Sequence, residues 1–303
     1  MIGGSSKTKL GVAASIASSS VFAVVFILSA YVDATVNELY GWRTFFTVAM
    51  LVAFLTVAKR WTGLKVLWRR ILDHPAIGLA LLVTAGILGA QQWLFTWAPG
   101  HGRGLQVALG YFIMPIMLAI IGRVVFKERL GAWRISAVAV AAAAVIYQSI
   151  QVGGLSWETL VVALGYPLYF TVRRFAGIGG SAGLSAEMML ALPVAILLLV
   201  LDDPTLRTLM NPVVAVNMVG FGILASVGIL LYIGSSQYLP MSVFGLLSYL
   251  EPILLALAAA LILNEPLSAK ELPTYITIGV ALILLAVESL VRKRPPRNQP
   301  LVM

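Results

Sequence analysis

One sequence motif occurs twice in this chain, at identical internal spacing and 137 positions apart. An aromatic residue stands three positions before a proline, and Glu-x-Leu begins thirteen positions after that proline. The first copy comprises Phe112, Pro115, Glu128 and Leu130, and the second comprises Tyr249, Pro252, Glu265 and Leu267. In both copies the proline lies inside a long apolar segment that ends just before the acid. This repetition predicts two homologous halves, 1–151 and 152–303, within one domain.

The two copies differ in the charge of the residues around their ends. Lys127 and Arg129 flank the acid of the first copy, whereas Asn264 and Glu271 surround that of the second. Lys and Arg are enriched in the cytoplasmic segments next to membrane helices. The two ends are therefore expected to face opposite sides of a membrane, which is the arrangement of an inverted repeat.

The composition requires a membrane as solvent. Hydrophobic residues make up 60% of the 303 residues and charged residues 11%, with a mean hydropathy of +0.96, too few polar groups to cover a soluble globular domain. A segment of about 20 apolar residues crosses the bilayer core as a helix, and continuous Leu- and Ala-rich segments favour helices over barrel strands. The predicted fold is all-α and polytopic, with ten transmembrane helices in a 5+5 inverted repeat around a central cavity. The spans are expected near 10–32, 39–58, 76–98, 104–126, 132–151, 155–175, 182–201, 213–237, 239–263 and 271–291.

The basic residues predict the orientation of these spans. With a cytoplasmic amino terminus, 17 of the 21 Lys and Arg residues fall in cytoplasmic segments, and only Arg103, Arg207 and Lys270 lie in outer loops. Both termini are therefore expected in the cytoplasm, and the second five spans cross in the opposite sense to the first five. Topology and attraction to anionic lipid explain the formal charge of +9, so no nucleic-acid partner is expected.

Several short sequence runs resemble a known transporter family. They are Gly-Tyr-Phe-Ile-Met-Pro at 110–115, Phe-Lys-Glu-Arg-Leu at 126–130, Leu-Asn-Glu-Pro-Leu at 263–267 and the stretch 38–43. Together with the ten-helix plan they resemble the EamA branch of the drug/metabolite transporter superfamily, in particular RarD/YddG-type bacterial exporters. The resemblance implies a carrier of the bacterial inner membrane whose central cavity is formed by spans 1–4 and 6–9. For YddG-like members it also implies export of amino acids, especially aromatic ones.

A carrier requires a water-accessible cavity near the midplane, lined by polar or aromatic side chains. Aromatic lining supplies area and stacking for apolar or aromatic substrates. An interfacial belt for the tryptophans and tyrosines, and close helix packing for the serines, are the alternatives. The residues expected to line the cavity are Trp42, Arg43, Gln92, Trp97, Tyr111, Tyr166, Tyr169, Ser248, Tyr249 and Glu251.

Five charges fall within or beside spans, where each costs from ~3 to more than 10 kcal/mol unless it finds water or a partner: Glu38, Arg43, Glu187, Glu251 and Glu288. Glu251 is interpreted as a contact for a substrate ammonium, as a protonatable group that couples transport to protons, or as a neutral acid bonded between helices. Arg43 is expected to hold a substrate carboxylate or to extend toward the membrane surface. For Glu38 and Glu187 the expectation is structural pairing.

Pro115 and Pro252 occupy equivalent positions in spans 4 and 9. Each removes a backbone hydrogen bond and bends its helix. Paired bends suit a mechanism in which one half rocks against the other, so both prolines are predicted hinges, with static bends as the alternative.

The sequence offers little for catalysis. It has no cysteine and two histidines, His74 and His101, both in expected loops, so thiol nucleophiles, thiolate zinc sites and the HExxH pattern are absent. Asp202 and Asp203 are interpreted as a helix stop, and the glycine-rich stretch 177–182 as a cytoplasmic hinge and not a dinucleotide site. No catalytic residue, metal or cofactor is predicted. The expected function is a secondary carrier for amino acids or similar small amphiphilic metabolites, with an intramembrane enzyme acting on a lipid-linked substrate or a non-transporting scaffold as alternatives.

Overall fold

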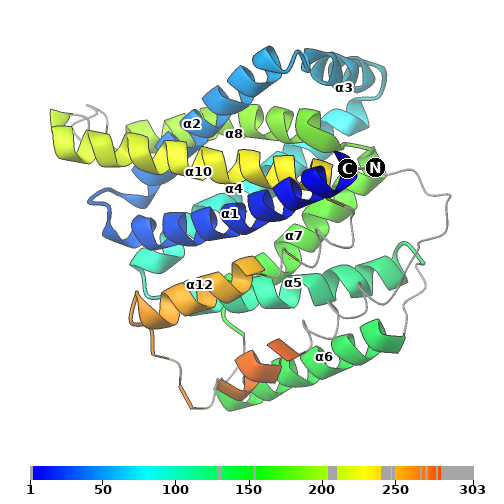
Figure 1. Cartoon of the computed structure of the whole chain (residues 1–303), viewed down its shortest axis with the longest axis vertical. Helices are drawn as coiled ribbons and strands as arrows, with labels where there is room; N and C mark the ends of the chain where they lie inside the picture. The colour runs from blue at the N-terminus through cyan, green and yellow to red at the C-terminus, as the bar shows by residue number, and fades with distance from the viewer. Residues whose placement is uncertain are drawn as a thin grey trace.

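The computed structural model describes residues 3–127, 132–152, 155–203, 210–239, 247, 250–266, 268–269, 272–277 and 279–280. These residues form helices and connecting turns, with no strand among them (Figure 1). The all-α prediction is therefore confirmed for the described part of the chain. The named helices are α1 (Gly3–Tyr31), α2 (Val36–Val57), α3 (Trp61–Asp73), α4 (Pro75–Gly100), α5 (Gly104–Val124), α6 (Ala132–Val152), α7 (Trp157–Ala176), α8 (Gly180–Asp202), α10 (Pro212–Tyr238) and α12 (Leu250–Leu261).

The first eight expected spans correspond to α1, α2, α4, α5, α6, α7, α8 and α10. Six described helices, namely α1, α2, α4, α5, α8 and α10, have segments long and apolar enough to cross a membrane. Of the ninth span the structure describes α12 and residue 247, and of the tenth only 272–277 and 279–280. The total of ten spans and the inverted repeat stay predictions.

Local signals set several helix ends. Thr35 and Glu38 form a capping box at the start of α2, in which each side chain binds the backbone N–H of the other residue. The Ser156 side chain caps α7 by accepting from the N–H of Thr159. At the other end of α7, Gly177 adopts a φ of 60°, a left-handed conformation that glycine reaches without strain. The segment 177–179 is therefore a short turn between α7 and α8.

Helix α3 was not predicted, since residues 61–73 were assigned to a cytoplasmic connection. It is amphipathic and carries Lys65, Arg69 and Arg70 among apolar residues. A search for continuous apolar segments misses such a helix because its apolar residues recur at helical spacing instead of in a block.

The helices pack around one large apolar core. Helix α1 lies between α10 and α12, α2 packs on α8 and α10, and α7 packs on α4 and α5 (Figure 1). The core contains buried residues of α1, α2, α4, α5, α7, α10 and α12, including Phe26, Leu94 and Phe221. Many large apolar side chains point outward instead, such as Leu79 and Leu201, which are 65% and 66% exposed. A surface of this kind is suited to lipid.

The two ends of the bundle differ in charge. The turns at 32–35 and 101–103 lie at one end, and α3 and the α7–α8 turn lie at the other (Figure 1). The end with α3 carries Lys59, Arg60, Lys65, Arg69, Arg70, Lys127, Arg173 and Arg174 together with Asp73, and is called the basic end below. The opposite end carries Asp33, Glu38, Glu158, Asp202, Asp203 and Glu265 together with Arg103, and is called the acidic end.

Candidate functional site

Five helices bring polar side chains together in the middle of the bundle. The central cluster consists of Arg43 (α2), Tyr111 (α5), Tyr166 (α7), Tyr232 (α10) and Glu251 (α12). The Tyr111 and Tyr166 hydroxyls are 3.1 Å apart and their ring centres 5.5 Å apart. Arg43 interacts electrostatically with both tyrosines and with Glu251, and Tyr232 with Glu251 and Tyr166. Every residue of the cluster thus lies within electrostatic range of others from different helices.

Arg43 is buried, with 4% of its surface exposed. Its Nη1 atom donates to Thr96 Oγ1 at 3.2 Å and to the Gln92 carbonyl oxygen at 3.5 Å. Its guanidinium carbon lies 5.1 Å from the centre of the Phe95 ring, a cation–π contact. Its Nε atom has no hydrogen-bond partner in the described part of the chain. These neutral contacts fix the guanidinium and leave its charge uncompensated by a direct ion pair.

Glu251, on α12, is the acidic member of the central cluster and lies within electrostatic range of Arg43. Among the described residues no nitrogen of a basic side chain lies within the 4.0 Å of an ion pair with Glu251. Glu251 and Tyr166 are half-buried, and Tyr232 is 36% exposed. An acidic and a basic side chain therefore lie within electrostatic range of each other, among tyrosines from three further helices.

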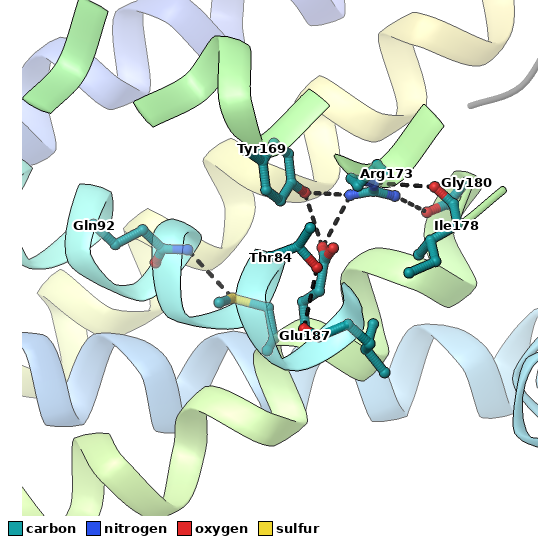
Figure 2. Close-up of polar contacts among 9 residues, drawn as sticks. Thr84, Gln92, Tyr169, Arg173, Ile178, Gly180 and Glu187 are labelled. Carbon is teal, nitrogen blue, oxygen red and sulfur yellow. Dashed lines mark hydrogen bonds and ion pairs between the residues drawn. The ribbon is translucent and has the colours of Figure 1, made fainter. Parts of the chain in front are cut away.

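A second polar network ties α7, α8 and α4 together nearer the basic end (Figure 2). Glu187 is fully buried, and its Oε2 accepts from Arg173 Nη1 at 2.9 Å and from the Tyr169 hydroxyl at 2.8 Å. The same Arg173 nitrogen also donates to the Tyr169 hydroxyl. Thr84 lies beside the carboxylate. The expectation of structural pairing at Glu187 is consistent with this geometry.

Arg173 also binds the turn that follows α7. Its Nε donates to the Ile178 carbonyl at 3.1 Å and its Nη2 to the Gly180 carbonyl at 3.5 Å (Figure 2). One guanidinium thus holds the end of α7, the turn and the first turns of α8 in a fixed relation. We call Thr84, Tyr169, Arg173 and Glu187 the basic-end network.

At the acidic end, Glu265 closes the contact between the two halves of the sequence. Its carboxylate oxygens accept from the backbone N–H groups of Gly104 and Leu105, both at 2.7 Å. These are the first residues of α5, where backbone N–H groups lack partners within the helix and favour an anion. Glu265 is the acid of the second motif copy, so the motif supplies a cap for a helix of the other half.

The predicted cavity residues divide among different environments. Trp42 lies in a group of rings on α2, 5.8 Å from Phe45 and 6.0 Å from Phe46 between ring centres. Its indole nitrogen is buried and has no partner among the described residues. Gln92 is buried between the central cluster and α8, and its side-chain amide donates to Met188 Sδ at 3.4 Å (Figure 2).

Two other predicted residues lie away from the central cluster. Trp97 stacks on His101 at 4.3 Å and packs 5.5 Å from Trp157, which is 51% exposed. This position at the acidic end corresponds to the belt alternative. Tyr169 belongs to the basic-end network. Ser248 and Tyr249 lie outside the described residues.

The expected hinges and Glu38 also have defined places. Helix α5 runs without interruption through Pro115, and Pro252 lies in the first turn of the described part of α12. Whether either position moves stays a prediction. Glu38 is the third residue of α2 and binds the Thr35 N–H at 2.6 Å, so it serves the helix cap.

Sequence reasoning missed three members of these clusters: Tyr232, Arg173 as the partner of Glu187, and Thr84. The sequence did contain a signal for the pairing of Arg173 with Glu187, because each is seven positions from Gly180. Residues equidistant from a turn face each other in a helical hairpin. Tyr232 gave no such signal, since it is one aromatic residue in a long apolar helix.

A separate cavity of about 110 Å³ opens between α5 and α7 near the basic end. The Arg174 guanidinium lies on its Phe126 wall, 3.9 Å from the ring centre. No member of the central cluster lines this cavity. Its lining residues are Leu118, Ile121, Gly122, Phe126, Phe170, Thr171 and Arg174.

The chain is similar to bacterial transporters over nearly its whole length. Residues 159–290 match the EamA-like transporter family. An uncharacterized transporter of Pasteurella multocida is 33% identical over 93% of this chain and 97% of that protein. The chloramphenicol-sensitive protein RarD of Pseudomonas aeruginosa is 34% identical over 84% of this chain and 87% of its own length.

More distant proteins cover even more of the chain. Protein RarD of Escherichia coli is 27% identical over 95% of this chain and 97% of that protein. A crystal structure aligns with a TM-score of 0.50 at 16% identity, over 96% of this chain and 99% of the other, which bears on the fold alone. The chain therefore belongs to the EamA-like transporter family, as a RarD-type member of the drug/metabolite transporter superfamily, and is a multi-pass membrane transporter.

Proposed function

We propose that this transporter is a secondary carrier that exports amino acids, aromatic ones in particular, or similar small amphiphilic metabolites across the bacterial inner membrane. One observation carries the proposal. Arg43 and Glu251, a basic and an acidic side chain, lie within electrostatic range of each other, yet no ion pair joins them in the described part of the chain. Charges held in an apolar interior are costly unless a partner reaches them.

A zwitterion would satisfy both charges at once. The planar guanidinium of Arg43 suits a carboxylate, which it can bind through two parallel hydrogen bonds. The Glu251 carboxylate would accept from the ammonium group. The rings of Tyr111, Tyr166 and Tyr232 would contact the substrate side chain through area and stacking. Such a site selects for the amino-acid backbone and tolerates a range of apolar or aromatic side chains.

The pairing of helices supports an inverted repeat as the basis of alternating access. Exchanging α1 with α7, α2 with α8, α4 with α10 and α5 with α12 converts the most extensive helix contacts into one another, whereas the α1–α4 contact has no α7–α10 counterpart of similar extent among the described residues. The α1–α10 contact becomes α7–α4, and α2–α10 becomes α8–α4. The α5–α7 contact becomes α12–α1, while α2–α8 and α5–α12 map onto themselves. Rocking one half against the other would expose the central cluster to each side in turn, with Pro115 and Pro252 as hinges.

The charges at the two ends of the bundle indicate its orientation in the membrane. Lys and Arg near membrane helices favour the cytoplasmic side, so the basic end faces the cytoplasm and the acidic end faces outward. Export then means that substrate enters past the basic-end network and leaves past Glu265. Exchange of protons at Glu251 would provide the driving force, and a pH gradient imposed on vesicles tests that step.

Counterflow of labelled tyrosine in proteoliposomes tests the binding residues. Replacing Arg43 with Gln or Glu251 with Gln should raise the tyrosine concentration that gives half-maximal exchange by about ten- to a hundred-fold, because each removes a charged contact of about 1.5–3 kcal/mol. Arg123→Gln, at the end of α5, is the control and should exchange as the wild type does. Normal exchange by both central variants would refute the proposed site. If the wild type exchanges none of a broad panel of amino acids, the proposed function itself is refuted.

A further inference from the structure

Helix α3 joins α2 to α4 at the basic end (Figure 1). Its side chains form three distinct faces. The first face packs on the protein: Leu67 is 6% exposed and packs with Leu81 and Ile178, with Ile71 beside them. The second face is apolar and open, with Trp68 62% and Leu72 65% exposed. Nothing else in the described part of the chain covers this second face.

The basic residues of α3 lie directly beside its open apolar face. Lys65 and Arg69 are both exposed, and each stands three positions before one of the open apolar residues, Trp68 and Leu72. Residues three and four apart are neighbours on a helix. The four side chains therefore form one continuous surface, with an apolar strip bordered by two cations. A helix that presents such a surface suits the boundary between acyl chains and anionic headgroups.

The position of α3 matches this chemistry. Its two neighbours in the chain, α2 and α4, are long and apolar enough to cross the bilayer, so their connection has to lie at the membrane surface. We propose that α3 is an interfacial helix that binds anionic phospholipid at the basic end. Trp68 and Leu72 insert between the acyl chains, and Lys65 and Arg69 bind the phosphate groups.

The third face of α3 links this lipid contact to the interior of the protein. Arg70 Nη1 donates to the Gly177 carbonyl at 2.8 Å and Nη2 to the Ala176 carbonyl at 2.9 Å. These carbonyls end α7, where a cation is favoured. The Gly63 Cα is also close to α8, since an added Cβ would lie 3.1 Å from the Ala182 Cβ. Lipid that holds α3 in the interface thereby holds the α7–α8 turn, which Arg173 joins to the basic-end network.

Because the chain has no cysteine, single reporters can test this placement. Leu72→Cys and Val66→Cys provide a matched pair, since both positions are exposed and apolar on the same helix (65% and 52%) but about 120° apart around its axis. A fluorophore at position 72 of the full chain in proteoliposomes should be quenched by nitroxide-labelled lipid and shielded from iodide. A fluorophore at position 66 should instead be quenched by iodide and shielded from nitroxide-labelled lipid. Iodide quenching that is equal at the two positions would overturn the interfacial placement.

Lipid selectivity is measured with the same reporter. In phosphatidylcholine vesicles containing one tenth phosphatidylglycerol, labelled phosphatidylglycerol should quench position 72 more strongly than labelled phosphatidylcholine. Replacing Lys65 and Arg69 with Gln should lower the relative affinity for the anionic lipid by roughly 25-fold, about five-fold per charge. Lys59→Gln with Lys127→Gln removes the same charge elsewhere at the basic end and should preserve the preference. Equal quenching by the two lipids in the unaltered helix would refute the anionic site. These readouts need no transport, so they stand or fall separately from the proposed function.

Discussion

The ion pair between Arg173 and Glu187 gives the sharpest stability prediction. Glu187 is fully buried, and its Oε2 carries both the bond to Arg173 and the bond to Tyr169. Replacing Arg173 with Met leaves that carboxylate with the tyrosine hydroxyl and Thr84 beside it. Breaking a buried pair from one side costs about 3–5 kcal/mol, because the remaining charge is left without compensation.

The opposite single change should cost less. After Glu187→Gln, Arg173 retains its bonds to two carbonyl oxygens of the following turn, and its side chain is 13% exposed. The expected loss is about 1–3 kcal/mol. Replacing both residues with Met removes both charges, and buried pairs replaced by apolar residues are often nearly neutral. The double variant should therefore be more stable than Arg173→Met alone.

Unfolding by sodium dodecyl sulfate in mixed micelles measures these differences, with tryptophan fluorescence as the signal. Arg174→Met is the matched control, because the neighbouring guanidinium is exposed and lies over the Phe126 ring, a cation–π contact worth about 0.5–1 kcal/mol. If the two single changes add in the double variant, or if Arg173→Met costs no more than Arg174→Met, the buried-pair interpretation is wrong.

Other close contacts lead to further predictions. Glu265→Gln should destabilise the protein by about 1–3 kcal/mol, since it removes the charge from two bonds to the start of α5; hydrogen exchange at residues 104 and 105 should accelerate, and unchanged protection there would contradict the cap. Gly110→Ala should cost about 1–3 kcal/mol, because its Cβ would lie 2.6 Å from the Val162 Cβ and 2.9 Å from the Thr159 carbonyl oxygen. Gly86→Ala, with nothing within 4 Å, should instead stabilise α4 by about 0.5–1 kcal/mol, and detergent unfolding midpoints distinguish the two signs.

Much of the fold was predictable because a membrane helix must satisfy its backbone internally and present an apolar surface. The start of α10 at Pro212 lies one residue from the expected 213, and α6 matches 132–151 to within one residue. Helix α3 escaped because its apolar residues are distributed around a helical face. Length and hydropathy detect helices that cross the bilayer, whereas amphipathic helices require the periodicity to be examined.

The candidate site was predictable in its residue types more than in its grouping. Arg43, Tyr111, Tyr166 and Glu251 were all expected in the cavity and do lie together. Tyr169 was expected with them, yet it binds Glu187. Tyr166 and Tyr169 share one broad face of α7 but are about 60° apart around its axis and about 4.5 Å apart along it, so tertiary packing decides which neighbour each one meets. The role of Glu265 as a cap for α5 was likewise beyond the sequence, since its partners are backbone groups far away in the chain.

The proposed function requires a zwitterion to bind between Arg43 and Glu251 during transport, and competition in tyrosine counterflow tests this most directly. Tyramine lacks the carboxylate, and 3-(4-hydroxyphenyl)propionate lacks the ammonium group. Each loses one charged contact of about 1.5–3 kcal/mol, so each should compete at least about ten-fold more weakly than unlabelled tyrosine. Competition by both analogues as strong as that of unlabelled tyrosine would contradict the proposed binding site.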